Sequence, residues 1–251
     1  MNPAIEFHRV QKSFGSQPVL RDFSLSVEQG AFLTVIGRSG CGKTTALRLV
    51  NALIAPDGGR VLVKGQDAAQ ADPAALRRGI GYTIQNVGLF PHMTVEKNIA
   101  YVPALSKSPL WKGEERRRRA AELLESVGLE PALAGRYPRE LSGGQRQRVG
   151  IARALAAQPD ILLMDEPFGA VDEITRRQLQ DEILRIHQER GITILFVTHD
   201  IEEALRLGTQ VLVMEEGRAA QLDAPSALMA RPATPFAAQL VRRSRDFSPR
   251  R

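Results

Sequence analysis

The sequence predicts an α/β protein built on a doubly wound, mostly parallel sheet. Short, continuous apolar runs indicate strands covered on both faces, and they occur at residues 32–36, 161–164, 192–197 and 211–214. Between these runs, apolar residues recur at helical spacing in the stretches 120–127 and 179–186. Strands that alternate with amphipathic helices in this way are typical of a sheet with helices on both faces.

The first thirty residues and the middle of the chain depart from this alternation. Residues 5–10 and 20–27 alternate polar and apolar side chains on either side of Gly15 and Ser16, which indicates an antiparallel sheet at one edge. From about Asn86 to Ala157 there is no clear strand, so a mostly helical insertion is expected. The predicted organisation is one composite domain (1–225) with an α/β core (1–85 and 158–225) and a helical subdomain (86–157), followed by a C-terminal helix and basic tail (226–251).

The composition excludes several classes of protein. The 251 residues are 43% hydrophobic and 25% charged, which fits a globular chain with a sizeable core and not a disordered, collagen-like or coiled-coil chain. A single cysteine excludes an internal disulfide framework and a multi-cysteine metal site. No apolar run approaches the roughly 18 residues of a membrane span, and the N-terminus lacks signal-peptide features, so a soluble, cytosolic chain is expected. The net charge of +6 fits nucleic acid, a membrane surface or simple solubility equally well.

A complete phosphate-binding loop follows the apolar run 32–36. Its sequence is Gly37-Arg38-Ser39-Gly40-Cys41-Gly42-Lys43-Thr44, which matches G-x-x-x-x-G-K-[ST] and precedes a helix-like stretch. Glycines let the backbone N–H groups turn toward phosphate oxygens, and the helix start adds its positive end. Lys43 is expected to meet the β- and γ-phosphates, and Thr44 to offer its hydroxyl to Mg²⁺. A chance glycine-rich turn is the alternative.

An acidic pair, Asp165 and Glu166, follows the apolar run 161–164. Asp165 suits the Mg²⁺ shell, and Glu166 suits a base that orients or deprotonates water. Alone, such a pair marks only the end of a strand. The phosphate loop upstream favours the functional interpretation.

The segment Leu141-Ser142-Gly143-Gly144-Gln145 distinguishes between phosphate-loop families. With Gln85, His199 and the two motifs above, it makes nearly the whole chain resemble the ATP-binding subunit of an ABC transporter. The resemblance implies a P-loop NTPase fold with a RecA-like parallel core, an N-terminal antiparallel β subdomain and an inserted helical subdomain. It also implies a homodimer, in which each ATP lies between one copy's phosphate loop and the other copy's Ser142 to Gln145. A helix start at Ser142 suits an anion, although a plain N-cap is the alternative.

The resemblance also implies roles for single residues. Phe14 matches the aromatic residue that stacks on adenine, with a core phenylalanine as the alternative. Gln85 matches the glutamine that reaches Mg²⁺ and the attacking water, and His199 the histidine that contacts the γ-phosphate and holds Glu166. The implied catalytic residues are Glu166, His199, Gln85 and Lys43, and the metal-binding residues are Thr44, Gln85 and Asp165. The implied ATP-binding residues are Phe14, Gly37, Arg38, Ser39, Gly40, Cys41, Gly42, Lys43, Thr44, Thr45, Ser142, Gly143, Gly144, Gln145 and Asp172, the last in a segment that communicates across the dimer.

Cys41 lies inside the phosphate loop. Inward N–H groups and Lys43 are expected to lower the pKa of its thiol. Alkylation is then expected to block ATP hydrolysis, and ATP to protect. An inert, buried cysteine is the alternative.

Two stretches, 81–95 and 167–176, narrow the resemblance to the branch that imports osmoprotectants such as glycine betaine, carnitine or choline. Neither holds a substrate pocket, so specificity is expected in partners: transmembrane permease subunits and, indirectly, an extracytoplasmic substrate-binding protein. The chain would then lie peripherally at the cytoplasmic face of the inner membrane, with Leu89 to His92 receiving a permease helix. Members of this branch often continue into paired nucleotide-sensing repeats, which are not expected here because the sequence stops at Arg251.

Alternative functions remain at this point. One is an ABC-type ATPase that imports another solute, such as an amino acid or a polyamine. A second is a nucleic-acid ATPase that uses Arg116 to Arg119, but Glu114, Glu115 and Glu122 lie beside this run, so a solvated face and no nucleic-acid partner are expected. A small-molecule kinase has no use for Ser142 to Gln145. For the basic tail, a solvated end is favoured over contact with anionic lipid.

Overall fold

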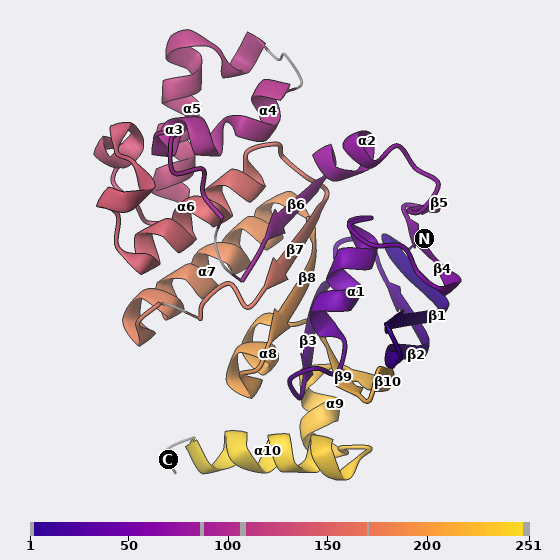
Figure 1. Ribbon diagram of the computed structural model, residues 1–251. Helices are drawn as coiled ribbons and strands as arrows, with labels where there is room; N and C mark the ends of the chain where they lie inside the picture. The colour runs from indigo at the N-terminus through magenta and orange to yellow at the C-terminus, as the bar shows by residue number, and fades with distance from the viewer. Residues whose placement is uncertain (1–2, 86–87, 106–108, 170, 248–251) are drawn as a thin grey trace. The chain divides into compact units, whose positions relative to one another are not determined.

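The computed structural model describes residues 3–85, 88–105, 109–169 and 171–247 (Figure 1). The chain divides into two compact units: unit 1 is Met1–Leu76 with Thr193–Arg251, and unit 2 is Arg77–Ile192. The domain boundaries expected from the sequence stay a prediction. Asn86, Val87 and Ala170, which belong to the stretches with osmoprotectant resemblance, and Arg250 and Arg251 of the basic tail lie outside the described residues.

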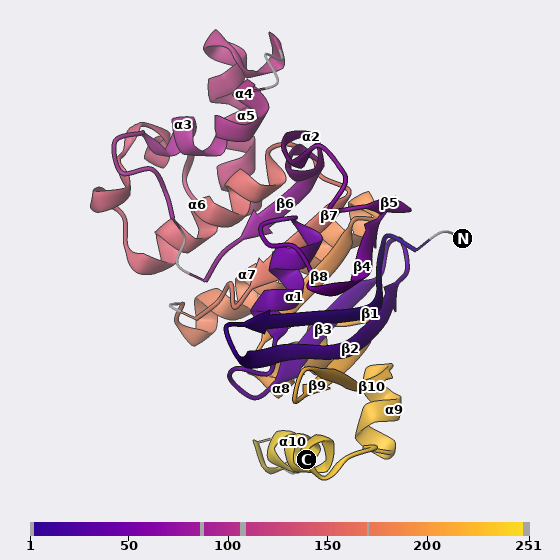
Figure 2. The ribbon, with the colours of Figure 1, turned by 45° about the vertical axis from the view of Figure 1, so that its right-hand side comes forward.

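Unit 1 begins with the predicted antiparallel sheet. Strands β1 (Ile5–Phe14) and β2 (Gln17–Val27) pair antiparallel and lie side by side in Figure 2. Strand β4 (Gly58–Val63) pairs with the other side of β1, and the short β5 (Gln66–Asp67) completes the sheet in the order β2-β1-β4-β5. The alternation expected of a half-buried strand is visible in β1, where Ile5, Phe7 and Val10 are buried.

The second sheet of unit 1 confirms the parallel core. Strand β3 (Phe32–Gly37) pairs parallel with β8 (Thr193–Thr198) on one side and with β9 (Gln210–Glu215) on the other. Strand β10 (Arg218–Asp223) closes this edge antiparallel to β9. Every residue of β3 and β8 is buried, as expected from their continuous apolar sequences.

Helices follow the strands of this sheet and pack against it. Helix α1 (Lys43–Val50) follows β3, α8 (Ile201–Leu207) follows β8, and α9 (Pro225–Ala230) and α10 (Pro235–Phe247) follow β10. One buried cluster joins Ile36 of β3, Ile201 of α8, Leu228 of α9 and Leu240 of α10. The predicted C-terminal helix is therefore packed into the core of unit 1. Helix α2 (Pro73–Arg78) lies at the junction of the units in the sequence.

Unit 2 contains one pair of strands and a set of helices. Strands β6 (Ile80–Thr83) and β7 (Ile161–Asp165) pair parallel. Between residues 88 and 157, the described segments contain helices and turns and no strand, as the sequence predicts. The helices of unit 2 are α3 (Val95–Ile99), α4 (Tyr101–Leu105), α5 (Gly113–Ser126), α6 (Gly143–Leu155) and α7 (Glu173–Arg190), with 3-10 turns η1 (Pro109–Trp111), η2 (Pro131–Gly135) and η3 (Pro138–Glu140).

The predicted apolar stripes on α5 and α7 are buried. Ala120 and Leu124 of α5 are buried, and so are Leu179, Ile183 and Ile186 of α7. Across the segments that the structure describes, no helix combines the length and apolarity needed to cross a bilayer.

Candidate active site

The phosphate loop joins β3 to α1 and is held by its own lysine. Lys43 is only 7% exposed, and its ammonium donates hydrogen bonds to the carbonyl oxygens of Gly37 (2.7 Å) and Arg38 (3.0 Å). Gly42, the residue before α1, has a φ of 106°, and a Cβ there would lie 2.6 Å from Leu20 Cδ2. Glycine is therefore required by both backbone and space. No side chain caps α1 at Gly42. Backbone N–H groups at the start of a helix, together with its positive end, suit an anion.

Cys41 does not have the lowered pKa expected from the sequence. Its side chain is buried, and burial raises the pKa of the thiol above its ordinary value. Lys43, whose ammonium lies 3.9 Å from Cys41 Sγ, pulls the pKa down, but this effect is smaller than the cost of desolvating a thiolate. The expectation was wrong because burial cannot be read from neighbours in the sequence.

Helix α10 contacts the phosphate loop through Phe236. The Arg38 guanidinium lies 5.1 Å from the centre of the Phe236 ring, within the range of a cation–π contact. The start of α10 is tied to the end of β9, because the Thr234 hydroxyl donates to Glu215 Oε1 and accepts from the Ala237 N–H at 3.1 Å. Nothing in the sequence pattern pointed to Phe236, since its partner is almost two hundred positions away in the chain.

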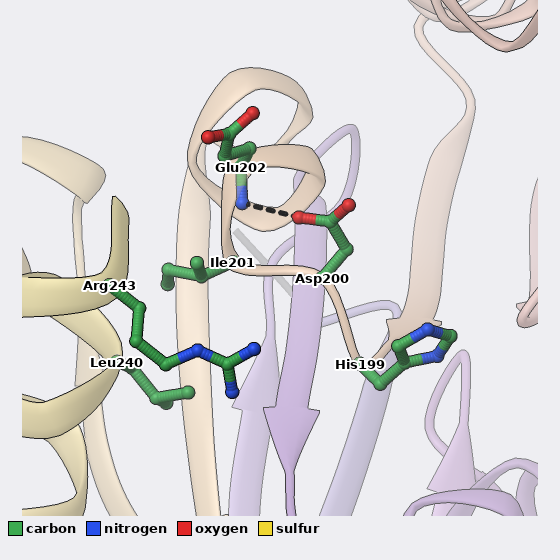
Figure 3. A pocket seen from close by; sticks show the side chains of 6 residues that line it. All are labelled: His199, Asp200, Ile201, Glu202, Leu240 and Arg243. Atoms are coloured by element: carbon green, nitrogen blue, oxygen red, sulfur yellow. Dashed lines mark hydrogen bonds between the residues drawn. The ribbon is translucent and has the colours of Figure 1, made fainter. Parts of the chain in front are cut away.

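His199, in the turn between β8 and α8, helps to line a cavity of about 280 Å³ together with residues of α8 and α10 (Figure 3). Its turn is fixed by Thr198, whose buried hydroxyl donates to Glu203 Oε2 (2.7 Å) and accepts from the Asp200 N–H (3.0 Å). The His199 ring is exposed, and Arg243 reaches toward the cavity from α10. The residues that line the cavity are His199, Asp200, Ile201, Glu202, Leu240 and Arg243.

Phe14 is not a core residue. It is the last residue of β1 and is 48% exposed, which excludes the alternative of a buried phenylalanine. The Lys12 ammonium lies 5.7 Å from the centre of its ring. Asp57 accepts hydrogen bonds from Lys12 Nζ and from the Ser13 N–H, both at 2.6 Å, and the bond from Lys12 lowers the pKa of Asp57. The Phe14 ring is therefore exposed at the end of β1, and the two hydrogen bonds to Asp57 hold the backbone of this strand end.

In unit 2, the structure brings together two of the predicted catalytic residues. Asp165 is the buried last residue of β7, and Glu166 follows it. Gln85 Nε2 donates a hydrogen bond to Glu166 Oε2 at 3.0 Å. The backbone of Glu166 has a φ of 45°, a left-handed conformation that costs about 1–3 kcal/mol for a residue other than glycine. Because strained backbone conformations are often kept at functional sites, this strain supports the view that the orientation of the Glu166 carboxylate matters for function.

Ser142 and Asp172 each start a helix. Ser142 Oγ accepts from the Gln145 N–H (3.2 Å), and Gln145 Oε1 accepts from the Ser142 N–H (2.9 Å), so α6 begins with a capping box. A Cβ at Gly144 would meet no atom of the described chain within 4 Å, so this helix start has open space beside it. Asp172 Oδ1 accepts from the Thr175 N–H at 3.0 Å, and this bond lowers the pKa of Asp172.

Asn98 shapes the segment that was expected to receive a permease helix. Its buried amide Nδ2 donates to the carbonyl oxygens of Phe90, Met93 and Thr94, each at 3.1 Å, and its Oδ1 accepts from the Phe90 N–H at 2.7 Å. Pro91 and His92 are exposed on this segment. Sequence reasoning missed Asn98, because a lone asparagine in a short helix carries no signal of its own.

The remaining predicted pairings stay predictions. They include the contact of His199 with Glu166, the sharing of Thr44, Gln85 and Asp165 by one metal ion, and the meeting of a phosphate loop with Ser142 of a second copy.

Comparison with known proteins supplies information on the chain as a whole. Residues 20–169 match the family described as ABC transporter. The chain is 48% identical over 240 residues to the glycine betaine uptake system ATP-binding protein YehX of Escherichia coli (strain K12), covering 96% of this chain and 77% of that protein. It is 45% identical over 244 residues to the sulfate/thiosulfate import ATP-binding protein CysA of Caulobacter vibrioides, covering 97% and 71%.

The chain spans about 60–77% of the length of these relatives. The carnitine transport ATP-binding protein OpuCA of Listeria monocytogenes is 44% identical over 242 residues, which cover 96% of this chain and 60% of that protein. Among solved structures, a dimeric post-hydrolysis state of the ATP-binding cassette MJ0796, bound to ADP and Pi, has a TM-score of 0.82 and 33% identity, covering 88% of this chain and 98% of that chain. This likeness confirms the predicted fold class.

Proposed function

Because the chain belongs to the ABC transporter family, we propose that it is the ATP-hydrolysing subunit of a membrane importer for quaternary-amine osmoprotectants such as glycine betaine, carnitine or choline. The observation that carries the enzymatic part is the hydrogen bond between Gln85 and Glu166, which fixes a carboxylate directly after a buried strand. The phosphate loop, with its uncapped helix start, supplies the phosphate-binding part.

Phosphate binding is assigned to the loop of unit 1. Its backbone N–H groups and the start of α1 would hold the β- and γ-phosphates, and Lys43 would exchange its two carbonyl partners for phosphate oxygens. The exposed ring of Phe14 is assigned to the adenine base. His199, also exposed, is assigned to the γ-phosphate.

Water activation is assigned to unit 2. Glu166 would take a proton from the attacking water, and Gln85 would hold the carboxylate and the water in line. Mg²⁺ is assigned to Thr44, Gln85 and Asp165, whose hydroxyl, amide and carboxylate oxygens are the donors that this ion prefers. When bound, the ion neutralises charge on the phosphate oxygens.

The partners follow from the same proposal. Two copies would bind ATP between the phosphate loop of one and Ser142 to Gln145 of the other, for which the open space at Gly144 leaves room. The segment around Pro91 and His92, rigid because of Asn98, would receive a permease subunit at the cytoplasmic face of the membrane. A substrate-binding protein would act on the other side.

The Glu166→Gln variant tests the enzymatic part. It should bind ATP and accumulate as a closed dimer, with turnover lowered on the order of 100-fold or more because the base is lost. Size-exclusion chromatography with ATP and a phosphate-release assay measure both properties. Near-normal hydrolysis by this variant would remove Glu166 from the role of base.

The substrate class needs a different experiment. YehX and OpuCA are named for glycine betaine and carnitine, at 48% and 44% identity to this chain, whereas CysA, named for sulfate and thiosulfate, lies between them at 45%. Purification of the native complex, followed by identification of the ligand on its binding protein, decides between these solutes. A sulfate, an amino acid or a polyamine on that protein would contradict the osmoprotectant assignment and leave the ATPase assignment intact.

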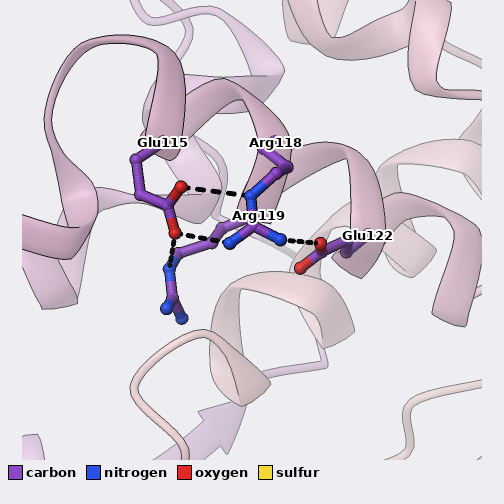
Figure 4. A network of polar contacts seen from close by, with 4 residues as sticks. All are labelled: Glu115, Arg118, Arg119 and Glu122. Carbon is purple, nitrogen blue, oxygen red and sulfur yellow. Dashed lines mark hydrogen bonds and ion pairs between the residues drawn. The ribbon is translucent and has the colours of Figure 1, made fainter.

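A nucleic-acid ATPase is disfavoured by the arginine run on α5. Arg118 is paired with Glu115 (2.6 Å) and with Glu122 (2.6 Å), and Arg119 also bonds to Glu115 at 3.0 Å (Figure 4). These positive charges are offset by carboxylates on the same helix face. The run is therefore a solvated, mixed-charge surface and a poor match for phosphate backbones.

A further inference from the structure

A small cavity in unit 2 is lined by Ile84 and Pro167, the sequence neighbours of Gln85 and Glu166. The volume open to the centre of a water molecule is about 10 Å³. One wall is the end of β6, another is α6, and the third is the residue after Glu166. The lining residues are Thr83, Ile84, Gln147, Gly150, Ile151, Arg153 and Pro167.

Two of these residues carry buried polar atoms without partners. Thr83 is 6% exposed and Gln147 is 4% exposed. Neither Thr83 Oγ1 nor Gln147 Oε1 has a hydrogen-bond partner within the described part of the chain. Buried polar oxygens without partners are costly and rare, so two of them on one small cavity require an explanation.

The size and chemistry of the cavity select its occupant. A single water needs about 10–15 Å³ of such volume and two or more polar partners, which this cavity offers. We propose that the cavity binds one ordered water, which accepts a hydrogen bond from the Thr83 hydroxyl and donates one to Gln147 Oε1.

This water would connect α6 to the segment that carries Gln85, and the catalytic meaning of this link rests on the proposed function. Gln147 lies on α6, which begins at the Ser142 capping box, and Thr83 lies two residues before Gln85. On the other side of Gln85, Arg153 of α6 donates to the Gly88 carbonyl oxygen at 2.9 Å. Helix α6 would therefore hold the chain both before and after Gln85.

Thr83 and Gln147 are thus positioning residues. They touch neither nucleotide nor attacking water, and act through Gln85 and its hydrogen bond to Glu166. A displacement of α6 at its Ser142 end would pass through the water to β6. The bound water would therefore couple the position of the start of α6 to the orientation of Glu166.

The direct test is a crystal structure of the full chain at a resolution that shows single waters. The expected result is one water within hydrogen-bond distance of both Thr83 Oγ1 and Gln147 Oε1. A cavity without a water, or a direct hydrogen bond between the two side chains, overturns the proposal. This outcome does not depend on whether the protein hydrolyses ATP.

Stability provides a second test that is also independent of ATP. Thr83→Val and Gln147→Met should each lower Tm by about 2–4 °C. The double variant should lose no more than either single variant, because each change removes the same bridge. Additive losses would show that the two side chains do not share a water.

Kinetics tests the positioning role. Both single variants should lower kcat roughly threefold to tenfold and leave KM for ATP within about twofold, because the phosphate loop is untouched. Ile151→Val, which changes packing on the same cavity without changing a polar atom, should retain kcat. Equal effects in all three variants, or none in Thr83→Val and Gln147→Met, would overturn the role. A wild-type chain without any ATPase activity would instead defeat the proposed function, and the crystal structure and Tm would still decide the water site.

Discussion

In the phosphate loop of unit 1, neighbours in the sequence hold one another: Lys43 donates to the carbonyls of Gly37 and Arg38, and α1 begins on a glycine. In unit 2, Glu166 is held by Gln85, which lies 81 positions away in the chain, through one exposed hydrogen bond. The loop is therefore shaped by local backbone geometry. The pair depends on how β6 and β7 are placed.

This difference separates binding from turnover. A loop of defined backbone shape gives affinity for a phosphate chain, whereas the carboxylate of Glu166, which Gln85 orients, can change its orientation when the strand before Gln85 shifts. Changes in the loop should therefore act mainly on ATP affinity, and changes at the pair mainly on kcat.

The largest expected effect breaks the loop. Gly42→Ala should lower ATP affinity on the order of 100-fold, because a left-handed residue other than glycine costs about 1–3 kcal/mol and the new Cβ would lie 2.6 Å from Leu20 Cδ2. Isothermal titration with ATP measures this. Gly144→Ala is the matched control: a Cβ there meets nothing within 4 Å of the described chain, so Tm and monomer affinity should be retained. Unchanged affinity in Gly42→Ala would show that the loop adapts.

The next effect concerns the pair. Gln85→Ala should lower kcat on the order of tenfold to 100-fold through misorientation of Glu166 and leave the Kd for ATP within about threefold. Steady-state hydrolysis and equilibrium binding separate the two quantities. An equal loss in both would contradict the division of roles between the two units.

A smaller effect links the loop to α10. Phe236→Leu removes the ring beside Arg38 and should raise KM for ATP roughly twofold to fivefold, the equivalent of about 0.5–1 kcal/mol. Arg38→Gln should do the same, and the double variant should match either single one. Independent, multiplying effects would show that the two side chains do not act as a pair.

The last effect leaves ATP binding and turnover of the unmodified protein unchanged and concerns the rate of a chemical modification. Because burial raises the pKa of Cys41, a smaller fraction is thiolate at every pH below that pKa, and alkylation should be slow near neutrality and rise about tenfold per pH unit. ATP should protect, and Cys41, the only cysteine, gives a clean signal in mass spectrometry. A rate that levels off near pH 7 would contradict the raised pKa.

Elements that are marked by neighbouring residues in the chain could be predicted from the sequence. The buried strands β3, β7, β8 and β9 are continuous apolar runs, and the phosphate loop is a consecutive motif, so all were predictable. Strand β4 was missed because it begins with Gly58 and Gly59 and only Val61 and Val63 are buried in it.

The rest depends on tertiary contacts between residues far apart in the chain. The raised pKa of Cys41 comes from burial, and the contact of Phe236 with Arg38 comes from the packing of α10 on β3 and α8. Asn98 and Gln147 are polar residues whose importance appears only once they are seen to be buried.

The contact between α10 and the phosphate loop also provides an optical signal. The chain contains one tryptophan, Trp111, which is buried in unit 2. A Trp111→Phe, Phe236→Trp protein would carry its only strong fluorophore beside Arg38, whose charge quenches or shifts indole emission as it moves. Nucleotide arrival at the loop would then be visible in real time by stopped-flow fluorescence, without a labelled nucleotide.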